Sequence, residues 1–289
     1  MAILIDPPRW PAHGTVFGHL VSDASLDELH DFASRAGLPT RAFDHDHYDV
    51  PESRYPALLQ AGATLVRERD LVRRLIASGL RVHAPQKAPT RSTALSLATS
   101  AWRGLGLPDD LRDDLIRRWV EPHRHYHDIR HLAQCLDALT LLGGATRATT
   151  LAAWFHDAVY EGRPGDEEAS ANLAERSLGR LVSGTEVDEV ARLVRMTAEH
   201  NPADPQAGLL SDADLSVLGQ VPGRYHVYLR DVRLDFEHLD DETWRRGRLQ
   251  VVGSLLAVEP LFHTVKGRAF WGDAARANLE AERDRLADA

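Results

Sequence analysis

The sequence predicts a two-part α+β chain, with a small α/β domain followed by a larger all-α domain. Near the N-terminus, short apolar runs alternate with segments of helical periodicity. After residue 93, the long segments carry apolar residues at three- and four-residue spacing. Between these regions, "HAPQKAPTRST" is rich in proline and polar residues, as linkers often are. We therefore expect an α/β domain over residues 1–84, a linker over residues 85–93 and an all-α domain over residues 94–289.

The first domain shows three candidate strands and two candidate helices. The strands are "AILID" (2–6), "TRAFD" (40–44) and "GATLV" (62–66). One helix begins after Ser25, a favourable N-cap residue, and stops at Gly37; the other covers residues 69–79 and stops at Gly79. Alternation of strands and helices predicts a mostly parallel sheet.

The second domain is expected to be helical throughout, because no long stretch alternates with a period of two. Amphipathic patterns cover residues 109–122, 126–142, 145–160, 166–181, 185–200, 224–239, 241–258 and 272–286. They show no repeat of the solenoid type. The expected fold is therefore a set of packed helices.

Composition limits the classes of function. The chain has 289 residues, 43% hydrophobic and 27% charged, with a formal charge of −9, which argues against a broad nucleic-acid surface. The single cysteine, Cys135, excludes an intramolecular disulfide. The N-terminus does not resemble a signal peptide and no apolar run is long enough for a bilayer. We expect a soluble cytoplasmic protein without a membrane partner, for which an oligomer remains possible.

A histidine–aspartate pair interrupts a strongly apolar segment in the middle of the helical domain. His156 and Asp157 lie in "LAAWFHDAVY", where burying an unpaired charge would be costly. A divalent metal would satisfy both groups, since imidazole nitrogen and carboxylate oxygen are ordinary ligands of first-row metals. A buried hydrogen bond between the two residues is the alternative, and for an isolated pair it is the more common arrangement.

Other segments carry matching residues before and after this pair. In "HRHYHDIRHL" (123–132), His127 and His131 are four residues apart and would share a face of one helix. In "LLSDADLSVLG", Asp212 and Asp214 lie among apolar residues. The order is therefore histidine, His-Asp, then a distant aspartate, each on its own helix.

From about Trp102 to its end, the chain resembles the HD superfamily of metal-dependent phosphohydrolases in this order of residues. "YHDIRHLAQCL" and "ADLS" are similar to metal-binding segments of cyclic-nucleotide phosphodiesterases, and "FHDAVY", "DEEASA", "TAEH" and "WRRGR" are similar to predicted bacterial HD phosphohydrolases. The resemblance implies a helical HD fold. It also implies four metal ligands and a proton donor, His127, with ligand duty as the alternative for that residue. The implied ligands are His131, His156, Asp157 and Asp214.

Further residues are candidates for catalysis or substrate binding. Asp157 or Asp214 could also orient the attacking water, and so could Glu161 or Glu167, although most carboxylates on such helices face solvent. His200 could bind a second metal or a substrate phosphate, or could cap its helix. Arginine can clamp phosphate in a bidentate geometry, with surface ion pairs as the alternative. The arginine candidates are Arg124, Arg230 and Arg233.

The function expected from these residues is hydrolysis of a phosphate ester of a nucleotide or a related small molecule by a metal-activated water. The divalent ion could be Mn, Fe, Co, Ni, Zn or Mg, because a mixed histidine and carboxylate site accepts several metals. The alternative function is a nucleotide-binding regulatory module that keeps the fold and turns over little.

The N-terminal domain resembles an uncharacterised bacterial domain of unknown function in its "HYD" and "GA" segments. It is rich in aspartate and histidine near expected strand ends. These residues could bind metal or phosphate, or could form an acidic, solvated loop. They are Asp6, His13, His19, Asp23, Asp44, His45, Asp46, His47 and Asp49.

Overall fold

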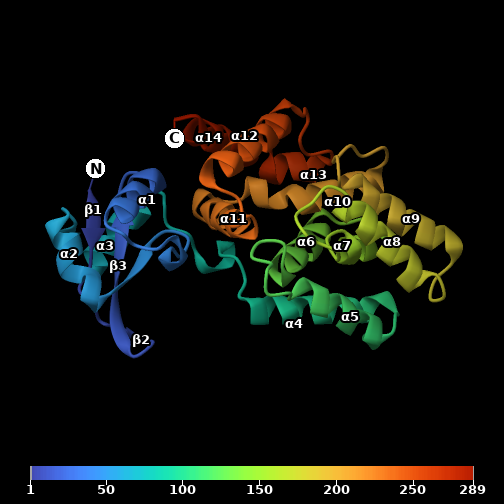
Figure 1. Ribbon diagram of the computed structural model, residues 1–289, viewed down its shortest axis with the longest axis horizontal. Helices are drawn as coiled ribbons and strands as arrows, with labels where there is room; N and C mark the ends of the chain where they lie inside the picture. The colour runs from blue at the N-terminus through green and yellow to red at the C-terminus, as the bar shows by residue number, and fades with distance from the viewer. Residues whose placement is uncertain (1, 289) are drawn as a thin grey trace. The chain divides into compact units, whose positions relative to one another are not determined.

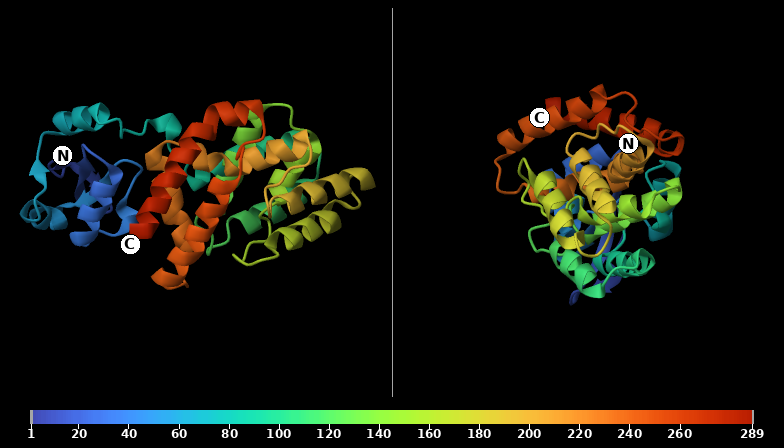
Figure 2. Two further views of the ribbon diagram at one scale, coloured as in Figure 1. Left: turned by 90° about the horizontal axis from the view of Figure 1, so that it is seen from above. Right: turned by 90° about the vertical axis from the view of Figure 1, so that its right-hand side faces the viewer.

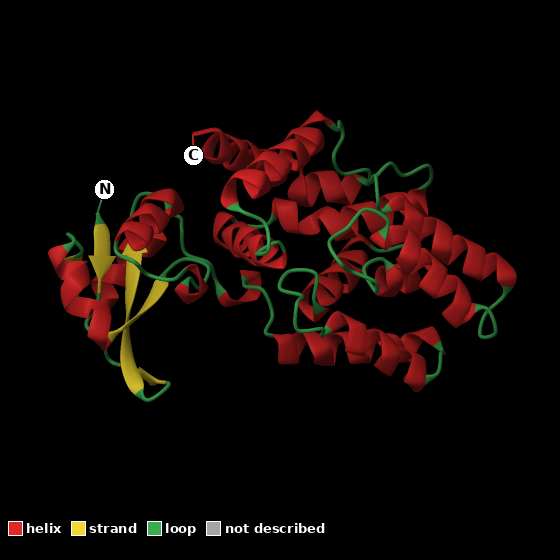
Figure 3. Ribbon diagram, viewed as in Figure 1, coloured by secondary structure: helices red, strands yellow, loops and turns green. Residues whose placement is uncertain are grey.

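The computed structural model describes residues 2–288 and divides into two compact units (Figure 1). The first contains the residues up to Lys87 together with Val221–Arg230, and the second contains Ala88–Gln220 and the residues from Asp231 onward. The outermost residues of the two expected domains, 1 and 289, lie outside the described part of the chain. As the sequence predicts, an α/β region precedes a large helical one, and Figure 3 shows strands in the first region alone among the described residues.

The first unit is built on a five-stranded sheet. Its strands are β1 (Ile3–Ile5), β2 (Trp10–Ala12), β3 (Thr15–Ser22), β4 (Tyr48–Pro51) and β5 (Thr64–Leu65). Its helices are α1 (Leu26–Arg35), α2 (Tyr55–Gln60) and α3 (Glu68–Ala77). Strand β3 pairs antiparallel with β1, β2 and β4, and β5 pairs parallel with β1. The expected mostly parallel sheet is therefore wrong, because β2 and β3 form a hairpin next to β1 that the apolar pattern did not show.

Residues of β1 alternate between the two faces of this sheet. Ile3 and Ile5 pack in a cluster with residues of α1 and α2, whereas Leu4 packs with Leu71 and Leu75 of α3. Val227 of α11 (Pro222–Asp235) is buried in the first of these clusters. Both faces are thus covered, which explains why β1 is a continuous apolar run.

Two of the three expected strands and both expected helices of this unit are present. Ser25 caps α1 as predicted, with its hydroxyl accepting a hydrogen bond from the Glu28 amide. The expected strand at residues 40–44 is wrong: Thr40–Ala42 form a 3₁₀ turn, and only Phe43 makes an isolated bridge to Tyr48. Pro39 precedes this turn and has no amide hydrogen for a strand ladder.

The second unit consists of helices joined by short connections. They are α4 (Arg91–Trp102), α5 (Asp109–Trp119), α6 (Ile129–Leu142), α7 (Arg147–Phe155), α8 (Asp166–Leu178), α9 (Gly184–Met196), α10 (Pro205–Asp214), the last residues of α11, α12 (Asp241–Ala257), α13 (Val265–Gly267) and α14 (Asp273–Asp288). Short 3₁₀ helices cover Thr40–Ala42, Glu52–Arg54 and Ala84–Gln86 in the first unit and Arg103–Leu105 and Leu215–Gly219 in the second; Arg268–Gly272 form a π-helical turn.

Helix α6 lies at the centre of the second unit, where it packs against α4, α7 and α10. Helices α8 and α9 lie side by side, as do α12 and α14 (Figures 1 and 2). The core includes Trp102, Trp119 and Trp154, each at most 1% exposed. Among the described residues, no helix combines the length and the apolar character that crossing a membrane would need.

Candidate metal centre

Four side chains meet where three helices end. His131 lies in the first turn of α6, His156 and Asp157 directly follow α7, and Asp214 is the last residue of α10. Helix α6 begins where it does because Asp128 is its N-cap and accepts a hydrogen bond from the Arg130 amide. Because these helices pack together, His131 and Asp214, which are 83 positions apart in the sequence, lie close together.

The distances within this cluster suit a shared ion. His131 Nε2 lies 3.0 Å from His156 Nε2 and 3.0 Å from Asp214 Oδ1. Asp157 Oδ2 lies 3.3 Å from His156 Nε2 and 3.6 Å from His131 Nε2. Ligands about 2.1 Å from a tetrahedral ion lie about 3.4 Å apart, so each histidine has the separation from the other and from the two carboxylates that coordination requires.

The tautomer of His156 suits a metal ligand. Its Nδ1 lies 2.8 Å from the carbonyl oxygen of Ala153, which can only accept, so Nδ1 carries the hydrogen. In the neutral ring the lone pair is then on Nε2, which faces His131 and the carboxylates. A hydrogen bond from the second ring nitrogen to backbone is a usual support of histidine ligands.

The cluster favours positive charge. Burial lowers the pKa of His131, but the neighbouring Cys135 and Asp214 more than offset this and raise the pKa of His131 to about 10. Burial also opposes the charge of His156, yet Asp157 and Asp214 raise its pKa. In return the two histidines lower the pKa of Asp214 against its burial. A buried site that holds protons this strongly is electrostatically suited to a cation.

Cys135 is a neighbour of the cluster that the predicted ligand set does not include. It is fully buried one turn after His131, with its sulfur 3.7 Å from His131 Nε2. The four-residue spacing was the available signal. Asp212, in contrast, accepts hydrogen bonds from the amides of His263 and Thr264, so it stabilises a loop.

His127 lies beside the cluster, but the expectation that it shares a helix face with His131 is wrong. Asp128 caps α6, so His127 precedes the helix. Its Nδ1 lies 2.8 Å from Asp235 Oδ2, and its ring stacks on Tyr160 with centroids 4.2 Å apart. The centroids of His127 and His131 are 5.9 Å apart. Because Nδ1 contacts Asp235, Nε2 is the nitrogen of His127 that is left for another partner.

Asp235 fixes the segment that carries His127. It is buried and accepts hydrogen bonds from the backbone amides of His125, Tyr126 and His127. Burial raises and His127 lowers the pKa of Asp235, and the net direction is downward. Asp235 was missed because 108 residues separate it from His127 and no local pattern marks it.

Arg124 is buried and contacts the backbone of the segments that carry the cluster. It is 0% exposed and donates to the backbone oxygens of His127, Asp157 and Ala158, as well as to Glu121. With its donors directed at the backbone, Arg124 positions the segments that carry the histidine and the aspartate. Its role in binding phosphate stays a prediction.

His200 and Glu167 lie near the ligands. His200 Nε2 is 3.5 Å from Asp214 Oδ2, and its Nδ1 is 3.1 Å from the Ser211 hydroxyl. Burial raises the pKa of Glu167, and the charges of Asp157 and Asp214 add to this effect. Glu161 is exposed, in the turn after α7.

The other two arginines make contacts elsewhere. Arg230 groups with the first unit, where it donates to the carbonyl oxygen of Phe43. Arg233 donates to Phe236, Leu239 and Asp241. Their role as phosphate ligands stays a prediction.

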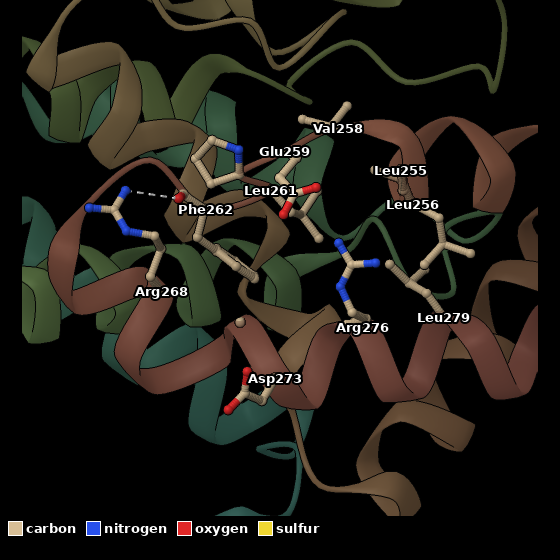
Figure 4. Close-up of a pocket in the computed structure, with 12 residues that line it drawn as sticks. Leu255, Leu256, Val258, Glu259, Leu261, Phe262, Arg268, Asp273, Arg276 and Leu279 are labelled. Carbon is tan, nitrogen blue, oxygen red and sulfur yellow. Dashed lines mark hydrogen bonds between the residues drawn. The ribbon is translucent and has the colours of Figure 1, made fainter.

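A separate cavity of about 210 Å³ lies between the end of α12 and the start of α14 (Figure 4). Arg268, Asp273 and Arg276 line it together with leucines and Phe262, and Arg268 donates to the Phe262 carbonyl oxygen. None of the sequence-predicted site residues lines this cavity, so it is distinct from the cluster around His131.

Comparison with known proteins informs the N-terminal unit. Residues 3–78 match a family model described as a protein of unknown function, DUF4031. This match agrees with the expected resemblance to a domain of unknown function. Searches of curated proteins and of solved structures found no match.

Proposed function

We propose that this protein is a metal-dependent phosphohydrolase of the HD type, which cleaves a phosphate ester of a nucleotide or a related small molecule. The observation that carries the proposal is that the Nε2 atoms of His131 and His156 lie 3.0 Å apart and each lies 3.0–3.6 Å from a carboxylate oxygen of Asp157 and of Asp214. These residues lie at the ends of three helices, α6, α7 and α10, in the order that HD proteins share. The donor set, two imidazoles and two carboxylates, fits Mn, Fe, Co, Ni or Zn better than Mg, which prefers oxygen ligands and water.

A divalent ion bound here would polarise a phosphoryl oxygen and lower the pKa of a bound water. The residues of the chain supply the rest. His127, oriented by Asp235, donates a proton from Nε2 to the departing oxygen of the ester. Asp157 has two carboxylate oxygens, so it can contribute one to the ion and orient the attacking water with the other. His200, held by Ser211, binds a phosphate oxygen beside Asp214.

In the same scheme, Glu167 can accept a proton from the attacking water. Its half-buried carboxyl has a raised pKa next to Asp157 and Asp214, so it is a better proton acceptor than an ordinary glutamate. Exposed Glu161 is the weaker of the two candidates for orienting water. Arg124 holds the backbone of the catalytic segments in place.

The test is a phosphate-release screen over nucleotides and small phosphate esters with Mn, Co, Ni, Zn and Mg. Asp214→Asn is the inactive variant, and Asp137→Asn, an exposed carboxylate on α6, is the matched control. We expect turnover by the wild type and the control and none by Asp214→Asn. The alternative, a nucleotide-binding regulatory module, predicts that nucleotides raise the melting temperature while the wild type releases no phosphate under any condition.

A further inference from the structure

The N-terminal unit has a second group of potential ligands, which the proposed phosphohydrolase does not use. His19, His47 and Asp49 each offer a ligand atom, and these atoms lie within 4.8 Å of one another. His19 is in β3, Asp49 is in β4, and His47 directly precedes β4. All three are partly exposed.

Strand geometry places the three side chains on one face of the sheet. His19 and Asp49 are directly opposite each other in the antiparallel pair of β3 and β4. His47 and Asp49 are two residues apart, so an extended backbone directs both to the same side. His47 Nε2 lies 3.4 Å from Asp49 Oδ1, and the rings of His19 and His47 meet edge to face at 5.1 Å.

A buried carboxylate supports each histidine from behind. Asp6 Oδ2 lies 3.1 Å from His19 Nδ1, and Asp46 Oδ1 lies 2.7 Å from His47 Nδ1. Asp6 and Asp46 are 1% and 0% exposed, so these contacts are built into the fold. Each contact fixes the ring and leaves Nε2 as the second nitrogen. A carboxylate that hydrogen-bonds the second ring nitrogen is the usual support of a histidine metal ligand. Both histidines have this support.

We propose that His19, His47 and Asp49 bind a divalent transition-metal ion, through Nε2 of both histidines and one oxygen of Asp49. Two imidazoles and one carboxylate select Zn, Co or Ni over Ca and Mg, which prefer sets made only of oxygen. Three protein ligands leave a position for water or a small anion. Asp49 also lines a hollow of about 680 Å³ together with Arg41 and Arg54.

The proposal is tested by zinc and cobalt binding to the full-length protein, independently of any activity. The metal-free protein is titrated with Zn²⁺, and Co²⁺ absorption reports the ligand geometry. The variants are His47→Ala and Asp49→Asn. The control is His13→Asn, which removes a nearby imidazole at a position with φ of 48°, where asparagine is tolerated. Each variant is also made together with Asp214→Asn, so that binding at the helical cluster is counted separately.

We expect His47→Ala and Asp49→Asn each to lose one bound zinc, or to bind it at least about 10-fold more weakly, in both backgrounds. The His13→Asn control keeps the ion. Asp46→Asn, which preserves the ligands and weakens the support of His47, reduces affinity by about 10- to 100-fold. Should His47→Ala fail to fold, Asp49→Asn decides, because half of its side chain is exposed. Zinc binding by folded Asp49→Asn that equals the control overturns the proposal.

Discussion

Replacement of His127 by alanine separates proton donation from metal binding. The ring contacts Asp235 and Tyr160 but is not among the four ligands, so His127→Ala should retain the metal. Loss of a general acid reduces turnover by about 100-fold or more. A 100-fold loss corresponds to about 2.7 kcal/mol of transition-state stabilisation. This loss should shrink for a substrate with a nitrophenolate leaving group, which departs without a proton.

The contact with Asp235 makes the test sharper. Asp235 acts on catalysis through His127, so Asp235→Asn should slow turnover, and the double variant should be no slower than His127→Ala alone. Asp235 also accepts three backbone amides, so its replacement by asparagine should cost about 1–3 kcal/mol of stability. Urea unfolding measures this cost separately from turnover.

The assay is steady-state hydrolysis of matched aryl and alkyl phosphate esters, normalised to bound metal. Loss of metal from His127→Ala would mean that His127 is a ligand. Equal losses on the aryl and alkyl esters would mean that it does not protonate the leaving group. Either result refutes the assignment of His127 as the acid.

Two further predictions concern buried and paired charges outside the ligand set. Arg124→Lys should lower the free energy of unfolding, measured in urea, by more than about 2 kcal/mol. The reason is that a lysine ammonium cannot donate to several backbone oxygens at once as the Arg124 guanidinium does. A variant of unchanged stability with only a raised KM would show instead that Arg124 binds substrate. Hydrogen bonds from His45 and Lys87 hold the pKa of Asp44 well below its ordinary value. Stability from Asp44 is therefore present above about pH 4 and lost as the pH falls further, so the stability difference between wild type and Asp44→Asn should shrink below that pH. A difference that is constant from pH 7 to pH 3 would contradict this assignment.

Local signals in the sequence predicted the elements that depend on local chemistry. Ser25 and the apolar spacing after it gave α1, and the helical spacing around Cys135 gave α6. Strand β3 was missed because Gly18 and His19 interrupt its apolar residues. Its antiparallel hairpin with β2 was therefore missed too, and the sheet was expected to be mostly parallel. Apolar periodicity reports burial of one element and does not report which strands pair.

In the candidate centre, too, the sequence predicted the residues with a local signal and missed those that depend on tertiary packing. His131, His156, Asp157 and Asp214 could be selected because polar residues in apolar helical segments are visible in the sequence. The partner of His127 could not, because Asp235 reaches it through tertiary packing alone. Arg124 was predicted to bind phosphate from its residue type, whereas its burial against backbone oxygens could be known only from the fold.

The central claim, that the helical cluster holds a divalent ion, is tested most directly by the metal content of Asp157→Ala. Asp137→Ala, an exposed carboxylate on α6, is its control. Both are measured with and without Asp49→Asn, to account for the N-terminal site. We predict that Asp157→Ala loses the ion of the helical cluster and all turnover, with its helical circular dichroism unchanged. A folded Asp157→Ala variant that keeps as much metal as Asp137→Ala would contradict the account.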